Sequence, residues 1–220
     1  RYVVQKGTSA TLNFAAVMAV ASRIFADYET TFPGLAAQYR AAAISAYDWA
    51  QANPNIAYSQ TFSVTGEYGD SNFSDDFSWA AAELFILTGE QTYWDDFDAQ
   101  TDGVDLPWWQ DVSSLPYISL AFHADAALTS AQKMEIEEDI VSYVDLILSR
   151  SSMSAYRVPM FSENFVWGSN ANAGNHGMMA LQAHRITGDD QYKQLAVAAA
   201  DYLLGRNAVG FSFVTGFGET

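Results

Sequence analysis

The chain has 220 residues, 50% of them hydrophobic, and its 26 acidic residues outnumber its 10 basic ones to give a formal net charge of −16. A surface this acidic would repel nucleic-acid phosphates and anionic lipid headgroups, so we expect neither nucleic acid nor a membrane as a partner. The absence of cysteine excludes disulfides and thiolate metal sites, and the three scattered histidines do not predict a zinc site.

Apolar residues recur at three- and four-residue spacing along most of the chain, which is the pattern of helices that bury one face. This pattern predicts seven helices, over residues 12–25, 35–52, 77–87, 112–127, 131–148, 176–186 and 192–204. Strand signals are weak, so we predict an all-α fold in a single domain spanning residues 1–220. Gly, Pro, Asn and Asp break the chain between the helices, and we expect the functional residues in these loops.

One local pattern occurs twice, at residues 87–93 and 186–192, each time between one apolar helix and the next. Gly89 and Gly188 can end the first helix in a left-handed conformation, and the acidic residue that follows suits the positive end of the second helix. The two matches therefore predict stacked helical hairpins. Because no fixed repeat of about 30 to 45 residues runs along the chain, a closed double ring of helices is favoured over an open solenoid.

An acidic loop, residues 66–76, precedes the helix predicted over 77–87. It holds four carboxylates, hydroxyl groups and loop carbonyls, the hard oxygen ligands that calcium prefers, although the spacing is not that of an EF-hand. The alternative is ordinary capping, with Ser74 at the N-cap and Asp75 and Asp76 favoured by the helix dipole. Composition alone leaves both interpretations open.

Aromatic residues make up 15% of the chain, and several lie beside polar residues in loops. Trp108 and Trp109 follow a proline, where they would either form a stacking platform for a sugar or fill the underside of a helical ring. Trp167 stands among Gly, Ser and Asn, a mixture suited to the face and the hydroxyls of a sugar. Arg206 and Asn207, at a helix end, would either join such a surface or satisfy free carbonyls.

Taken in chain order, these clusters resemble the catalytic domain of glycoside hydrolase family 9, the inverting cellulases built as an (α/α)6 barrel. The resemblance covers essentially the whole chain and rests on residues 11–19, 66–76, 79–84, 167–170, 202–207 and 214–218. It implies that the parent protein hydrolyses internal β-1,4-glucosidic bonds of cellulose or a related β-glucan with inversion. It also implies a barrel that is incomplete in this chain, because a full double ring needs more helices than the seven predicted here.

The resemblance further implies particular site residues. A calcium ion would be held by Ser71, Asn72, Asp75, Asp76 and Asp111. A sugar cleft would be lined by Trp167, with Trp108 or Trp109 as a second aromatic residue. The aspartates that activate water in the family lie before the equivalent of Tyr2 and the general acid lies beyond Thr220, so we expect no catalytic residue in this chain.

Inversion needs two carboxylates roughly 6.5–9.5 Å apart. We predict none in this chain, and we interpret Glu163 as a solvated loop residue. The expected partners are a cellulose or β-glucan oligosaccharide and the missing segments of the same catalytic domain. We expect a secreted bacterial protein whose export signal is not present in this chain. Three alternatives stay open: a non-catalytic carbohydrate-binding helical domain, an exo-acting enzyme of the same family, and an interaction scaffold of helical hairpins.

Overall fold

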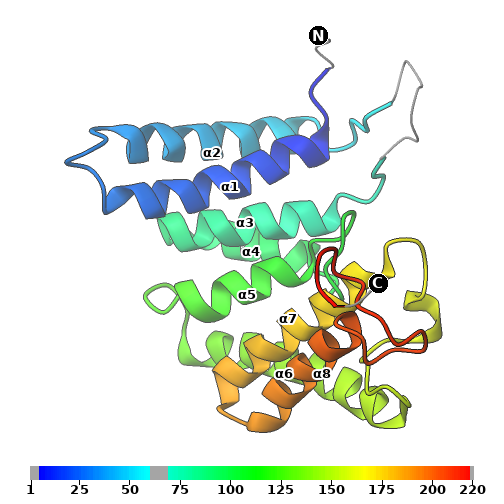
Figure 1. Cartoon of the computed structure of the whole chain (residues 1–220). Helices are drawn as coiled ribbons and strands as arrows, with labels where there is room; N and C mark the ends of the chain where they lie inside the picture. Colours follow the sequence, from blue (N-terminus) through cyan, green and yellow to red (C-terminus); the bar gives the residue numbers. More distant parts are fainter. Residues whose placement is uncertain (1–4, 60–68, 219–220) are drawn as a thin grey trace. The chain divides into compact units, whose positions relative to one another are not determined.

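A computed structural model describes residues 5–59 and 69–218 (Figure 1). These residues form α-helices, one short 3-10 helix and no strand, which confirms the all-α prediction. In chain order the elements are α1 (Thr8–Ala26), α2 (Leu35–Ala52), α3 (Ser74–Thr88), α4 (Gln91–Gln100), α5 (Ser114–His123), α6 (Ser130–Met153), η1 (Ser162–Asn164), α7 (Ser169–Thr187) and α8 (Asp190–Leu203).

The chain divides into two compact units. The first unit comprises residues 1–102 and 110–128, and the second comprises residues 103–109 and 129–220. The prediction of one domain over residues 1–220 stays a prediction, and each unit is described by itself.

In the first unit, α1 packs against both α2 and α3, and α3 packs against α4 and α5. Figure 1 shows α1 and α2 side by side along their lengths. Fully buried alanines on the facing helices, among them Ala15, Ala19 and Ala81, keep the helices close together. By length and composition alone α1 could also cross a membrane, but here it takes part in the packing of the first unit.

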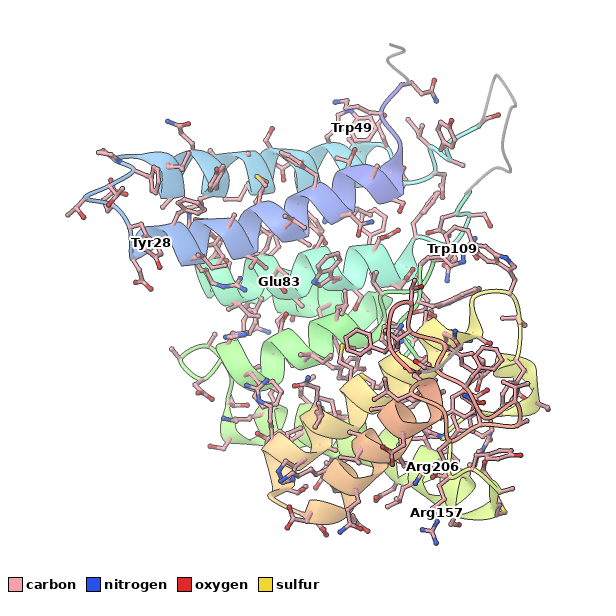
Figure 2. The ribbon with its side chains drawn as sticks, in the orientation of Figure 1. Tyr28, Trp49, Glu83, Trp109, Arg157 and Arg206 are labelled. Atoms are coloured by element: carbon pink, nitrogen blue, oxygen red, sulfur yellow. The ribbon has the colours of Figure 1, made fainter. Side chains whose placement is uncertain are left out.

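A buried glutamate joins three helices of the first unit. Glu83, on α3, is 1% exposed and accepts a hydrogen bond from Arg23 of α1 at 2.5 Å (Figure 2). Its other carboxylate oxygen accepts from Trp79 Nε1 at 3.2 Å and from Ser119 Oγ of α5 at 2.5 Å. Each oxygen of this buried acid therefore has a protein partner, and one of the partners carries the opposite charge.

In the second unit, α7 packs against α6 and α8. Gly177 of α7 lies so near α8 that an added Cβ would be 3.2 Å from the Cβ of Ala199, which explains a glycine at this crossing. A capping box begins α6, in which the Thr129 side chain accepts from the backbone N–H of Gln132 and the Gln132 side chain accepts from that of Thr129.

Both predicted hairpins are present. Gly89 and Gly188 each have a φ of 73° and end α3 and α7 in the left-handed conformation, as expected. Asp189 caps α8 by accepting from the backbone N–H of Gln191 at 2.9 Å. The sequence prediction omitted α4, began α7 too late and extended α5 too far at both ends.

Candidate functional site

The predicted calcium ligands lie around the first turn of α3. Asp75 and Asp76 are 6% and 2% exposed, which is unusual for carboxylates without a basic partner. Of the capping alternative, Ser74 as the N-cap is wrong, because α3 begins at Ser74 with Phe73 at the N-cap and no side-chain cap, whereas Asp75 and Asp76 do lie in the first turn. Instead, Asn72 Oδ1 accepts from the backbone N–H of Ser74 at 3.3 Å and from its hydroxyl at 2.9 Å.

Each buried aspartate has one oxygen with a partner and one without. Asp75 Oδ2 accepts from the backbone N–H of Val112 at 2.8 Å, and Asp76 Oδ1 accepts from Asn13 Nδ2 at 2.6 Å. Asp75 Oδ1 and Asp76 Oδ2 are buried with no hydrogen-bond partner. A buried charge left in this condition costs several kcal/mol unless a proton or a cation compensates it.

The electrostatics of the pair follow from this burial. Burial raises the pKa of Asp76 to about 7; the nearby Ser9 hydroxyl and the Asn13 amide oppose the rise, and the charge of Asp75 adds to it. Burial also raises the pKa of Asp75; the Val112 N–H opposes that rise, and the charge of Asp111 adds to it. The pair lacks positive charge and has a further negative charge nearby.

The remaining predicted ligands lie in the two loops beside the pair. Ser71 and Asn72 are exposed in the loop before α3. Asp111 precedes α5, and its Oδ1 accepts from the backbone N–H of Ser113 at 2.9 Å. Glu67, in the same acidic stretch, lies outside the described residues.

Protein contacts already join the two loops. Gln110 Nε2 donates to the carbonyl of Gly69 at 2.6 Å, and Val112 donates to Asp75 as described above. Gln110 and Asn13 therefore hold the acidic region in place, and neither was singled out for this role from the sequence. Asn13 could not have been found by spacing, because it is 63 residues away from Asp76.

The donor set fits a hard cation such as calcium. Across residues 5–59 and 69–218, no three His, Asp or Glu side chains are arranged to hold a metal ion. A cation at the acid pair would therefore need hydroxyl, carbonyl or water oxygens as well, and calcium accepts this mixture of ligands. The two unpartnered buried carboxylate oxygens are the observation in favour of such a cation.

The three predicted sugar-stacking tryptophans lie in the second unit. Trp167 is 91% exposed, and Trp108 and Trp109 are 44% and 56% exposed, so none of the rings is buried in this chain. The rings of Trp108 and Trp109 are 5.9 Å apart at 71°, and Figure 2 shows Trp109 on its loop. Asn175 of α7 donates to the carbonyl of Pro107 at 2.5 Å and ties this loop to the helix.

Two further sequence candidates have local structural roles. Arg206 donates to the Ala198 carbonyl at 3.1 Å and pairs with Asp201, and Asn207 donates to the Tyr202 and Phe211 carbonyls, so both residues satisfy free backbone groups. Glu163 lies on η1 at the surface, 3.8 Å from Arg150, in agreement with its interpretation as a solvated residue.

Comparison with known proteins gives a consistent picture. The family model described as "Glycosyl hydrolase family 9" matches residues 1–220. The chain is 34% identical over 233 residues to the xyloglucan-specific endo-beta-1,4-glucanase BoGH9A of Bacteroides ovatus, covering 99% of the chain and 40% of that protein. It is also similar to a solved structure described as Bacteroides ovatus GH9, with 34% identity, a TM-score of 0.89 and coverage of 100% of the chain and 43% of the other.

A second solved structure, AaCel9A in complex with cellobiose-like isofagomine, matches with 28% identity and a TM-score of 0.83 over 98% of this chain and 41% of that one. The expected fold class, all-α and an incomplete (α/α)6 barrel, is therefore confirmed. The chain spans about two fifths of the relatives that it matches here. It belongs to glycosyl hydrolase family 9.

Proposed function

We propose that the protein to which this chain belongs hydrolyses internal β-1,4-glucosidic bonds of cellulose or a related β-glucan, with inversion. The family match over residues 1–220 carries this proposal. It is supported by a relative named as an endo-beta-1,4-glucanase and by a family member solved with a cellobiose-like ligand. Because the chain spans only 40% of that relative, the activity is proposed for the longer protein.

The proposed role of the second unit is to bind the sugar chain. The exposed ring faces of Trp108, Trp109 and Trp167 can stack on the apolar faces of glucose rings, and the hydrogen bond from Asn175 to Pro107 holds the loop that bears two of them. A neutral glucan also suits a chain whose net charge is −16, since no anionic group has to be brought close to it.

The proposed role of the acidic region is structural. Asp75 and Asp76, with Ser71, Asn72 and Asp111, would hold a calcium ion. The ion would supply the positive charge that the buried pair lacks, and it would brace the loop before α3 against the loop at Asp111. The catalytic carboxylates implied by the family resemblance match no residue of this chain, so we assign none of these acids a part in bond cleavage. We also propose that the enzyme is secreted, since its proposed substrate is an extracellular polysaccharide.

Reducing-sugar release from carboxymethyl-cellulose tests the proposed activity. The 220-residue chain is assayed beside the natural full-length protein, and proton NMR of the first product reports the anomer. We expect activity with inversion from the full-length protein and none from the 220-residue chain. Inactivity of the full-length protein on all β-1,4-glucans would contradict the proposal, and turnover by the short chain would show that the catalytic acids are within it.

Cellotetraose binding tests the stacking platform. Replacing Trp167 or Trp109 by Ala should weaken binding by about 2- to 12-fold each, the equivalent of about 0.5–1.5 kcal/mol per lost ring contact. Trp49→Ala is the matched control, because Trp49 lies on α2 of the first unit and its ring faces the Lys6 ammonium, 4.2 Å from the ring centroid. If all three variants and the unmodified chain bind cellotetraose with equal affinity, the tryptophans are not part of the sugar site.

A further inference from the structure

The first unit contains a polar cavity that borders the proposed calcium loop at Ser71 and Asn72, and whose lining residues on α2 and α4 have no role in the proposed function. Its volume is about 550 Å³, and its lining includes Tyr47, Gln51, Asn55, Phe77, Asp96 and Gln100, from α2, α3, α4 and the loop after α2. This volume is within the range of roughly 300–1,000 Å³ that is usual for small-molecule sites. We call this cavity the Asp96 pocket.

Three polar side chains of the Asp96 pocket form a hydrogen-bonded group before any ligand arrives. Asp96 Oδ2 accepts a hydrogen bond from Tyr47 Oη at 2.9 Å and another from Gln51 Nε2 at 2.8 Å. The Tyr47 ring is held edge-on against Phe77 and Tyr93, with ring centroids 6.2 and 5.6 Å away. Burial, and then the contact with Asp96, raises the pKa of Tyr47 well above its ordinary value, so its hydroxyl stays a donor. A ligand would therefore meet an acceptor already held in place, which reduces the entropy lost on binding.

The residues that line the pocket favour some classes of ligand over others. No Lys or Arg is among the described residues that line the pocket, so an anion would find no counter-charge and would face the carboxylate of Asp96. A metal ion is disfavoured as well, because Asp96 is the one acidic side chain among the described residues that line the pocket. Hydroxyl groups suit the pocket best, since they donate to a carboxylate and exchange hydrogen bonds with the amides of Gln51, Asn55 and Gln100. Phe77, which is partly exposed, adds an apolar surface beside them.

We propose that the Asp96 pocket binds a neutral saccharide, as a second carbohydrate site in addition to the tryptophan platform. Asp96 accepts hydrogen bonds from the sugar hydroxyls, the neighbouring amides complete the hydrogen bonding, and Phe77 contacts the ring. The choice of a β-1,4-glucan as the saccharide rests on the proposed function. The pocket would hold the polymer near the enzyme without taking part in bond cleavage.

Titration of the 15N-labelled 220-residue chain with cellotetraose, followed by NMR, tests the proposal. Calcium is kept saturating, because Ser71 and Asn72 also line the pocket. We expect saturable shifts of the side-chain amide signals of Gln51 and Asn55, and we expect them to persist in the Trp167→Ala variant. Asp96→Ala should weaken binding in the pocket about tenfold or more, as expected for losing a hydrogen bond to a charged group. Asp95→Ala is the matched control, since Asp95 is the preceding residue on α4 and does not line the pocket.

The outcomes separate this inference from the proposed function. Shifts confined to the tryptophan signals would overturn the pocket while leaving the glucanase proposal intact, and shifts that rise linearly without saturation would overturn it too. If Asp96→Ala is poorly folded by circular dichroism, Gln51→Ala replaces it, because Gln51 is exposed and its loss should be tolerated. Unchanged affinity in Gln51→Ala would then contradict the proposal.

Discussion

Helix α3 carries buried acids of two kinds, and the difference between its two regions is instructive. Glu83, in the middle of the helix, has a protein partner at each oxygen, including the guanidinium of Arg23. Asp75 and Asp76, at its first turn, are also buried, but each keeps one oxygen without a partner. The fold compensates the first acid by itself. The second pair has only neutral donors, so its compensating charge must come from a proton or from a bound cation.

The largest expected effect concerns the compensated acid. Arg23→Met leaves Glu83 buried without its counter-charge, and we expect the free energy of unfolding to fall by about 3–5 kcal/mol. Urea denaturation measures this loss. The double variant Arg23→Met, Glu83→Met removes both charges and should recover most of the stability. A loss below about 1 kcal/mol in the single variant would mean that the two regions do not differ as described.

A smaller effect is expected from the residue that holds the uncompensated pair. Asn13 donates to Asp76 at 2.6 Å and fixes the orientation of that carboxylate. We expect Asn13→Leu to weaken calcium binding by about 10- to 100-fold, the usual effect of losing a partner of a metal ligand. Calorimetric titration with calcium measures the affinity. Asn175→Leu is the control, since Asn175 bonds to Pro107 in the second unit, and an equal loss in both variants would argue against a positioning role for Asn13.

A buried histidine extends the comparison to the second unit. His176 is 1% exposed, and burial lowers its pKa to about 4, opposed by a hydrogen bond with the backbone of Asn172. It avoids the cost of a buried charge by staying neutral. In the unfolded chain this histidine has its ordinary pKa of about 6.5, so on acidification the unfolded chain binds the proton before the folded one does. The stability that His176 contributes is therefore complete above about pH 6.5 and is lost as the pH falls toward 4.

Between about pH 4 and 6.5, His176 should make the free energy of unfolding rise with pH by at most about 1.4 kcal/mol per pH unit. Urea denaturation of the unmodified chain and of His176→Gln between pH 4.5 and 7 measures it, and the variant should lack this part of the slope. His123→Gln, at an exposed position, should retain the slope. Parallel pH curves for His176→Gln and the unmodified chain would show that the buried histidine does not behave as described.

Periodicity predicted the helices that bury a clear apolar face. The prediction for residues 35–52 coincides with α2, and those for 12–25 and 192–204 fall within a few residues of α1 and α8. It failed at α4, where Phe97 is the buried residue and the rest of the helix is largely polar. The first two turns of α7 were missed because Asn and Gly, which are poor helix formers, fill them.

The site was only partly predictable for a different reason. The acid pair is contiguous in sequence, so composition found it. Its burial and its partners Asn13 and Val112 depend on contacts over 63 and 37 residues, which spacing cannot reveal. The Asp96 pocket is also assembled from distant segments, and Tyr47 and Asp96 are 49 residues apart. Composition therefore found the acid pair, the family resemblance supplied Ser71, Asn72 and Asp111, and long-range packing determined which carboxylate oxygens lack a partner.

Thermal unfolding of the unmodified chain and of Asp76→Asn at pH 7.5, in calcium and in chelator, tests whether a cation completes the acid pair. When the calcium concentration is about 100 times the dissociation constant, the free energy of unfolding of the unmodified chain should rise by about 2.7 kcal/mol. The variant should gain little, and in chelator it should be as stable as the unmodified chain or more stable, because one uncompensated buried charge is gone. An identical response of both chains to calcium, or no response in either, would contradict the account.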